Sequence, residues 1–294
     1  MEKLKGMSAE VKVAWAQACS QGSFENNAEY YLSKCQELAK QGAELIFLPE
    51  LFLWDYFAIR EDMAVFDQAI TLDSPTLKPF KECAQLNQLT LFLPIFEKRA
   101  PGVYHNTVVA IGPQGEMLDF YRKMHIPDDP CFYEKYYFSP GDTGFKVIAT
   151  PKLNVGILIC WDQWFPEAAR LTAMKGADLL YYPTAIAWDQ NEPGEIYEEQ
   201  CDSWRVINRS HSIANGVYSL AVNRVGTQEN LTFWGNSQLT HPTGRVMSLL
   251  GSEEGSVLME LDPSAVEAHR KAWPFFRDRR IDAYGDLLKR WGDS

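Results

Sequence analysis

Apolar and polar positions alternate along the first part of the chain with two different periods. Residues 11–17 (VKVAWAQ) alternate as in a half-buried strand, whereas residues 26–40 have the spacing of a helix that Gly42 is placed to end. Residues 44–50 (ELIFLPE) form a second apolar strand. The pattern predicts a β-α-β unit at the start of the chain.

The same alternation continues through the rest of the chain. Residues 74–88 open with Ser-Pro, an N-cap followed by proline at the first helical position, and predict a helix. Residues 89–98 predict a strand, and residues 106–123 predict a hairpin that turns at residues 112–115 (GPQG). The second half is predicted to contain strands at residues 153–160, 178–183 and 216–224, helices at residues 166–175 and 195–214, and a strand pair that turns at residues 241–244.

No sequence repeat or low-complexity linker separates the two halves. We therefore predict a single α/β domain over residues 1–294, in which helices cover mixed sheets. Its core is expected at about residues 11–262, and residues 263–294 are expected to form a C-terminal extension that contacts another subunit.

The composition is that of an ordinary globular protein of 294 residues, with 46% apolar and 23% charged residues. The formal net charge of −11 argues against a nucleic-acid partner, which would need clustered Lys and Arg. This acidity suits a neutral or cationic small substrate, but it equally serves to keep a protein in solution. The chain has no uncharged apolar run of about 18 residues and no apolar h-region near its start, so we expect no membrane contact and a cytoplasmic location.

Cysteines and histidines indicate neither disulfides nor a metal site. The six cysteines are scattered without C-x-x-C pairs, which predicts reduced thiols. The five histidines lack metal-ligand spacing, and the chain has no G-x-S-x-G, G-x-G-x-x-G, P-loop or H-E-x-x-H motif. We therefore expect neither a metal nor a cofactor.

Three residues of reactive types lie at the ends of predicted strands, where α/β proteins gather their functional groups. Glu50 ends the strand LIFLPE, Lys123 follows the hairpin, and Cys160 ends the strand VGILIC. Each has an ordinary structural alternative, because buried cysteines act as small hydrophobic residues, a buried carboxylate can be hydrogen-bonded, and most lysines are solvated.

Cys160 stands directly before a helical segment. Backbone N–H groups and the positive end of a helix favour a thiolate, and the N–H of Trp161 can face an oxyanion. The sequence alone therefore makes Cys160 a candidate nucleophile, and a cysteine-histidine pair with His125 is an alternative arrangement.

The segments around these three residues resemble the signature blocks of the nitrilase-like carbon–nitrogen hydrolases, the nitrilase superfamily. They are FLPELF around Glu50, YRKMHIPDDP around Lys123 and GILICWDQWFPEAARL around Cys160, and they occur in the family's order. The resemblance extends over residues 11–284. It implies a four-layer α-β-β-α sandwich, a Glu-Lys-Cys triad that works through a cysteine thioester, and assembly into homo-oligomers of two or more subunits.

Within this superfamily, runs such as YEKYYFSPGDTGF, YPTAI and WPFFRDRRIDAY resemble the branch that hydrolyses N-carbamoylputrescine to putrescine, carbon dioxide and ammonia in polyamine biosynthesis. The resemblance implies that Cys160 attacks the ureido carbonyl carbon and that Glu50 is the general base. It further implies that Lys123 and the N–H of Trp161 hold the oxyanion, and that Glu134 orients Lys123. A surface salt bridge is the ordinary alternative for Glu134. The expected partner is a small ureido compound with a distal ammonium group.

The same resemblance suggests which residues choose the substrate. Asp189 matches the position at which this branch carries an acidic residue facing the amine, although Glu192 or Glu195 could substitute for it. A solvated loop aspartate is the ordinary alternative. Tyr56 and His125 are expected to line the substrate channel.

Two rival functions share this sequence pattern. A β-ureidopropionase, or an aliphatic amidase or nitrilase, would use the same chemistry, but β-ureidopropionate ends in a carboxylate and would favour an arginine in place of Asp189. A nitrilase-fold scaffold without turnover is the second rival. Subunit contacts are expected from the residues Trp204, Ile207, Trp273, Phe275 and Phe276.

Overall fold

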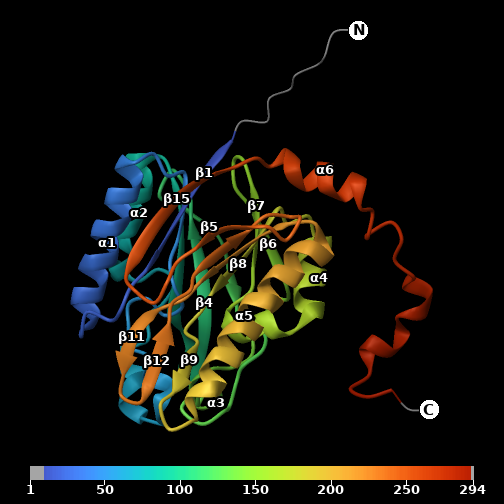
Figure 1. Ribbon diagram of the computed structural model, residues 1–294. Coiled ribbons are helices and arrows are strands. Elements are labelled where there is room, and N and C mark those ends of the chain that lie inside the picture. The colour runs from blue at the N-terminus through green and yellow to red at the C-terminus, as the bar shows by residue number, and fades with distance from the viewer. Residues whose placement is uncertain (1–9, 293–294) are drawn as a thin grey trace.

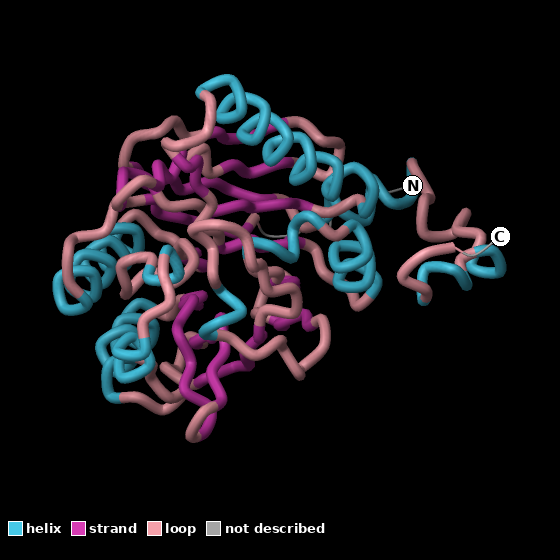
Figure 2. Tube along the Cα trace, turned by 90° about the horizontal axis from the view of Figure 1, so that it is seen from below, coloured by secondary structure: helices cyan, strands magenta, loops and turns pink. Residues whose placement is uncertain are grey.

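Two six-stranded sheets pack face to face at the centre of the computed structural model, which describes residues 10–292. Helices α1 (Phe24–Lys40) and α2 (Lys78–Asn87) cover the first sheet, and α4 (Pro166–Met174) and α5 (Gly194–Asn215) cover the second (Figures 1 and 2). The expected four-layer α-β-β-α sandwich is confirmed. Residues 1–9 and 293–294, which the single-domain prediction includes, lie outside the described residues.

The strand order shows how distant parts of the chain share a sheet. The first sheet runs β15 (Gly255–Leu261), β1 (Val11–Gln17), β2 (Leu45–Phe47), β3 (Thr90–Ala100), β4 (Val103–Ile111) and β5 (Met117–Arg122). The second runs β14 (Val246–Leu249), β13 (Gln238–Thr240), β10 (Tyr218–Val222), β8 (Leu179–Pro183), β7 (Asn154–Ile157) and β6 (Lys146–Ala149).

The two-residue period of the strands explains the layers. In β1, Val13 and Trp15 belong to the core between the sheets, whereas Ala14 belongs to the core that α1 covers. The helix α1 begins after Ser23, whose side chain accepts a hydrogen bond from the N–H of Asn26. Because successive side chains of a strand point to opposite faces of the sheet, the strand contributes to two separate hydrophobic cores.

Several predicted strands are shorter than expected, and two of these differences concern candidate site residues. β2 ends before Glu50, and β7 ends before Cys160. The chain turns sharply beyond each strand, because Leu51 and Cys160 have φ values of 50° and 41°, which lie outside the strand region. Both functional side chains therefore stand on turns rather than on strands.

Sequence patterning also missed several short elements. A three-stranded sheet has the order β11 (Val225–Gln228), β12 (Leu231–Trp234) and β9 (Ala187–Asp189), and β6 and β15 complete the larger sheets. The helix predicted at residues 74–88 begins as a 3-10 turn, Pro75–Leu77, and becomes α-helical only from Lys78. Except for β15, which has seven residues, the missed strands have three or four residues and are too short to show a clear two-residue period.

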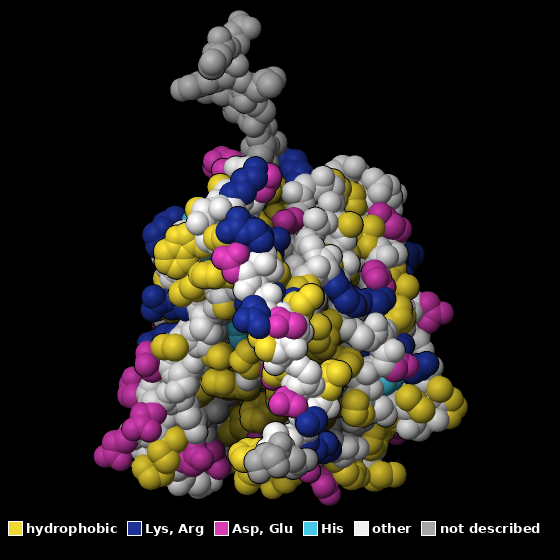
Figure 3. All heavy atoms as spheres, turned by 90° about the vertical axis from the view of Figure 1, so that its right-hand side faces the viewer, with side chains coloured by type: hydrophobic (Ala, Val, Ile, Leu, Met, Phe, Trp, Pro, Cys, Tyr) yellow, Lys and Arg dark blue, Asp and Glu magenta, His cyan; other side chains and the backbone are white. Residues whose placement is uncertain are grey.

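The C-terminal extension leaves the body of the sandwich. After α6 (Ser264–Ala272) the chain runs along the outside, in red in Figure 1. Figure 3 shows the side of the molecule on which this segment lies, with apolar side chains at the surface. Large apolar side chains of the extension are exposed, namely Trp273, Phe275, Ile281, Leu287, Leu288 and Trp291. Exposed apolar side chains of this kind are available for contact with another molecule.

Two of the residues expected at a subunit contact make contacts within the chain: Trp204 is buried, and Phe276 is partly buried. Trp204 is fully buried, and its indole N–H donates to Gln163 Oε1 at 2.6 Å. Phe276 packs against the guanidinium groups of Arg170 and Arg270, 4.9 and 5.0 Å from the ring centroid. Both aromatic side chains therefore make contacts that stabilise the single chain.

No helix among the described residues is long and apolar enough to cross a lipid bilayer.

Gly156 in β7 offers a test of how tightly the second sheet packs on α4. A Cβ atom at this position would lie 2.3 Å from Cγ2 of Thr172 and 3.0 Å from Cβ of Ala177. We expect Gly156→Ala to lower the free energy of unfolding by about 1–3 kcal/mol, because the core must shift to admit a methyl group. Urea unfolding monitored by circular dichroism measures the change.

The matched control is Gly194→Ala at the start of α5, where a new Cβ would meet nothing within 4 Å. This variant should stay within about 0.5 kcal/mol of the wild type. Equal stability of the two variants would contradict the tight contact.

Candidate active site

Lys123 joins two carboxylates in the interior of the protein. Its Nζ atom donates to Glu50 Oε1 at 2.9 Å and to Glu134 Oε2 at 2.6 Å, and all three side chains are buried. Glu50 follows β2, Lys123 follows β5, and Glu134 opens the short helix α3 (Glu134–Tyr137). Residues that are far apart in sequence therefore form one charged cluster.

The charges in this cluster determine which groups carry a proton. Burial lowers the pKa of Lys123, but the charges of Glu134 and Glu50 outweigh it and leave this pKa above its ordinary value. Lys123 is therefore an ammonium ion. Burial raises the pKa of Glu134 to about 7, against the opposing effects of Lys123 and the Tyr56 hydroxyl.

Cys160 begins a 3-10 helix, Cys160–Trp164, and is buried at the inner end of a pocket. Burial, reinforced by the charge of Glu50, raises the pKa of its thiol well above the ordinary value, although Lys123 opposes the shift. The resting side chain is therefore a neutral thiol. Desolvation therefore outweighs the stabilisation of a thiolate that the adjacent helical turn is expected to provide. A nucleophilic role for Cys160 requires a base that removes the proton during attack.

Asp162 organises the turn that carries Cys160. One carboxylate oxygen accepts from the N–H of Ile159 at 2.9 Å and from the hydroxyl of Tyr121 at 2.8 Å. The other accepts from the N–H of His125 at 3.0 Å and lies 2.7 Å from its Nδ1 atom. Asp162 thus ties the cysteine turn to the segment after Lys123. The sequence analysis missed this residue, and its acidic side chain two positions after Cys160 was the available signal.

His125 does not line the pocket, contrary to expectation. Its ring stacks on Phe165 with centroids 3.8 Å apart and is bonded to Asp162. It supports the turn from outside. The alternative pairing of His125 with Cys160 finds no support in these contacts.

Tyr56 also stands behind the site rather than along the channel. Its hydroxyl donates to Glu134 Oε1 at 2.9 Å, so the two oxygens of Glu134 are bonded to Tyr56 and Lys123 respectively. The backbone of Tyr56 is held by the side chain of Gln228 through bonds of 2.9 and 3.1 Å. Tyr56 therefore fixes the orientation of Glu134.

The loop that carries Glu50 is held by hydrogen bonds from two residues outside the first sheet. Tyr181 in β8 donates to the carbonyl of Leu48, and Arg224 donates to the carbonyl of Trp54 at 2.5 Å. These bonds lie on both sides of Glu50. Tyr181 of the second sheet and Arg224, which lies between β10 and β11, therefore hold the turn that carries Glu50.

The pocket that ends at Cys160 has a volume of about 600 Å³ and an acidic lining. Its acidic residues are Asp129, Glu134, Asp189, Glu192 and Glu199, and its apolar ones include Phe132, Trp161, Trp164, Ile186, Ile196 and Trp234. Glu195 is not part of the lining, and none of the lining residues is Lys, Arg or His. This composition suits a cationic ligand with an apolar stem.

Asp189 is held rigidly at the pocket wall in β9. Its Oδ1 atom accepts from the N–H and the side-chain amide of Asn191 at 2.9 and 2.8 Å, and from Asn230 Nδ2 at 2.7 Å. The backbone bond from Asn191 is the main cause of a lowered Asp189 pKa. Asp189 therefore offers a fixed negative charge to the pocket.

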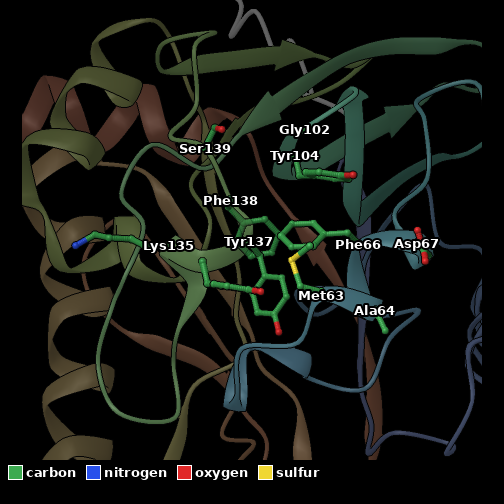
Figure 4. Close-up of a pocket in the computed structure, with 11 residues that line it drawn as sticks. Met63, Ala64, Phe66, Asp67, Gly102, Tyr104, Lys135, Tyr137, Phe138 and Ser139 are labelled. Atoms are coloured by element: carbon green, nitrogen blue, oxygen red, sulfur yellow. The ribbon is translucent and has the colours of Figure 1, made fainter.

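A second pocket, of about 680 Å³, lies on the other side of α3 (Figure 4). Lys135, Tyr136 and Tyr137 of α3 line it together with Phe66 and Tyr104. Ring centroids of Phe66 lie 4.7 Å from Tyr104 and 5.4 Å from Tyr137. This aromatic cluster supports the helix whose first residue, Glu134, faces the site.

The raised pKa of Glu134 predicts a stability signature. Glu134 takes up a proton more readily in the folded state, so its contribution to stability falls as pH rises from about 4.5 to about 7. In Glu134→Gln the amide can still accept from Lys123 and donate to Tyr56, but it cannot titrate. We expect the wild type to lose stability relative to this variant between pH 4.5 and 7, as measured by urea unfolding.

Glu82→Gln, at an exposed position in α2, serves as the control and should show no such pH-dependent difference. A constant difference between the wild type and Glu134→Gln would contradict the raised pKa.

Comparison with known proteins places this site in a family. Residues 12–271 match the carbon–nitrogen hydrolase family. The N-carbamoylputrescine amidase of Oryza sativa subsp. japonica is 37% identical, over 98% of each chain, and the citrullinase of Francisella tularensis is 37% identical, over 96% of this chain and 100% of the relative. A crystal structure of a carbon-nitrogen hydrolase from Helicobacter pylori G27 superposes with a TM-score of 0.93 at 38% identity, over 97% of this chain and 100% of the other. The chain therefore belongs to the carbon–nitrogen hydrolase family and is a hydrolytic, amide-cleaving enzyme.

Proposed function

We propose that this enzyme hydrolyses N-carbamoylputrescine to putrescine, carbon dioxide and ammonia, a step in making polyamines. The observation that carries the proposal is the pocket, which joins a buried cysteine to an acidic lining without a basic residue. Such a pocket matches a ureido group at one end of an apolar chain and an ammonium group at the other. Relatives named N-carbamoylputrescine amidase at 36–39% identity support the same substrate.

The first half of the proposed reaction forms a covalent intermediate. Glu50 takes the proton of Cys160 as Sγ attacks the ureido carbonyl carbon. Lys123 and the N–H of Trp161 stabilise the oxyanion that develops, a contribution of roughly 3–4 kcal/mol for one such donor. The C–N bond to the terminal nitrogen breaks, Glu50 returns the proton to it, and ammonia leaves an S-thiocarbamate on Cys160.

The second half releases the amine. Glu50 takes a proton from water, which attacks the thiocarbamate carbon, and the C–S bond breaks. Sγ recovers its proton, and the freed N-alkylcarbamic acid decomposes to carbon dioxide and putrescine. Glu134 and Tyr56 keep Lys123 in place throughout, since Glu134 bridges these two side chains.

Citrulline is the second candidate substrate, because the Francisella citrullinase is as similar to this chain as the rice amidase. Citrulline carries the same ureido and ammonium groups but adds a carboxylate. That carboxylate would meet Asp189, Glu192 and Glu199, with no Lys, Arg or His in the pocket lining to bind it. The same argument disfavours N-carbamoyl-β-alanine, the substrate of a β-ureidopropionase.

Ammonia release from three compounds tests the proposal. We expect kcat/KM to fall in the order N-carbamoylputrescine, citrulline, N-carbamoyl-β-alanine, because only the first presents a cation without an anion. Cys160→Ala should release no ammonia from any of them, and a trapped thiocarbamate on Cys160 should appear by mass spectrometry in the wild type. Faster turnover of either carboxylate compound would overturn the substrate assignment. Retained activity in Cys160→Ala would overturn the mechanism.

Asp189 is proposed to bind the distal ammonium group. Asp189→Asn should reduce kcat/KM for N-carbamoylputrescine by about 10- to 100-fold, mainly through KM, because a charge-assisted hydrogen bond is lost. Turnover of N-butylurea, which lacks the ammonium group, should change little. Steady-state ammonia assays measure both.

Glu195→Gln is the matched control, since Glu195 lies near Asp189 in sequence but outside the pocket lining. A larger loss in Glu192→Gln or Glu199→Gln than in Asp189→Asn would assign the ammonium group to α5 and its preceding turn instead.

We also propose that the enzyme acts in the cytoplasm as a homo-oligomer. The six cysteines are all free, which agrees with a reducing compartment. The exposed apolar residues of the C-terminal extension, among them Trp273 and Trp291, offer a surface for a second copy.

A further inference from the structure

We propose that Asn106 is a positioning residue that, together with Lys123, occupies one oxygen of Glu50 so that the other oxygen, Oε2, is the atom that takes the proton of Cys160. This inference rests on the role of general base proposed for Glu50. It concerns how one carboxylate is held, and it applies to any substrate that the cysteine attacks.

The two donors converge on a single atom. Asn106 Nδ2 donates to Glu50 Oε1 at 2.6 Å, and Lys123 Nζ donates to the same Oε1 at 2.9 Å. Asn106 lies in β4 and is buried. The backbone carbonyl of Asn106 also accepts a hydrogen bond from the backbone N–H of Lys123 at 2.9 Å. One residue therefore fixes both the base and the cation beside it.

The other oxygen of Glu50 is left without a donor. Among the described residues, Glu50 Oε2 is buried and has no hydrogen-bond partner, and the same holds for Asn106 Oδ1. A carboxylate has lone pairs on both oxygens, and donors on one of them reduce its attraction for a proton. The unbonded, desolvated Oε2 is therefore the more basic atom.

An amide is well suited to this place. It donates a hydrogen bond without adding a charge, so it orients Glu50 while leaving the ion pair with Lys123 as the main electrostatic contact. An ammonium or guanidinium group here would add a cation that stabilises the carboxylate further and weakens it as a base. An aspartate would bring a like charge against Glu50.

A merely structural role for Asn106 is the alternative, since the bond also joins β4 to the loop after β2. The two roles differ in what they change. A structural bond affects the amount of folded protein, whereas a positioning bond affects proton removal from Cys160 in protein that is fully folded.

The test compares Asn106→Leu with Thr107→Val. Leucine keeps the approximate shape of asparagine but donates nothing. Thr107, the next residue of β4, is also buried, and its hydroxyl donates at 2.6 Å to Glu97, a carboxylate outside the cluster, so Thr107→Val removes a comparable bond. Circular dichroism and urea unfolding establish that each protein is folded under the assay conditions.

We expect Asn106→Leu to lower kcat about 100-fold with KM changed by less than about threefold, the size of effect that a misplaced catalytic group produces. The titratable or charged groups that interact with Glu50 are Lys123, Glu134, Cys160, Tyr56, Tyr181 and Arg224, and neither variant alters them.

A second readout needs no substrate. Iodoacetamide alkylates Cys160 only as its thiol loses a proton, and peptide mapping separates this site from the other five cysteines. Alkylation of Cys160 should slow about 10-fold or more in Asn106→Leu and remain as in the wild type in Thr107→Val.

The outcomes separate this inference from the proposed substrate. If alkylation is slow in Asn106→Leu but the wild type does not hydrolyse N-carbamoylputrescine, the role of Asn106 is supported and the proposed substrate is rejected. Unchanged alkylation and an unchanged kcat in folded Asn106→Leu would overturn the inference, whichever substrate is turned over. Equal losses in Asn106→Leu and Thr107→Val would overturn it as well, by showing a general effect of loosening β4.

Discussion

The ammonium group of Lys123, buried between Glu50 and Glu134, is the interaction on which the rest of the site depends. Burying a charged side chain lowers the stability of a protein unless the charge is paired and hydrogen-bonded. Removing one of these three side chains would therefore leave an unpaired charge in the interior. The cluster therefore holds three loops together from the interior. It also defines the electrostatics of the site, because the same charges act on the thiol of Cys160. The contacts of Lys123 with Glu50 and Glu134 therefore affect both the stability of the fold and the charges around Cys160.

The cysteine turn is held by a different carboxylate. Asp162 receives donors from its own turn, from Tyr121 and from His125, and so fixes Cys160 relative to the segment that carries Lys123. Cys160 itself has a φ of 41°, which a non-glycine residue adopts only when its surroundings impose it. One carboxylate, Asp162, holds the turn of Cys160, and two others, Glu50 and Glu134, hold the ammonium group of Lys123.

The pocket adds selectivity to this machinery. Part of its wall comes from β9 and α5, which do not carry the residues of the charged cluster. Two relatives of equal similarity to this chain bear different names, N-carbamoylputrescine amidase and citrullinase. Fixed negative charge at Asp189 and the lack of basic lining residues favour a cation in this protein.

By itself, the sequence determined the alternation of strands and helices and the α/β class, because these depend on local periodicity. Contiguous motifs carried the resemblance to the family, and that resemblance pointed to Glu50, Lys123, Cys160 and Glu134. Only the tertiary structure showed that burial raises the pKa of the Cys160 thiol. It also placed His125 and Tyr56 behind the pocket, where they bond Asp162 and Glu134. The contacts of Asp162 and Asn106 likewise became visible only in the folded chain. Each of these depends on burial and on hydrogen bonds between residues tens of positions apart. Desolvation and long-range pairing are properties of the folded surroundings, so no local pattern records them.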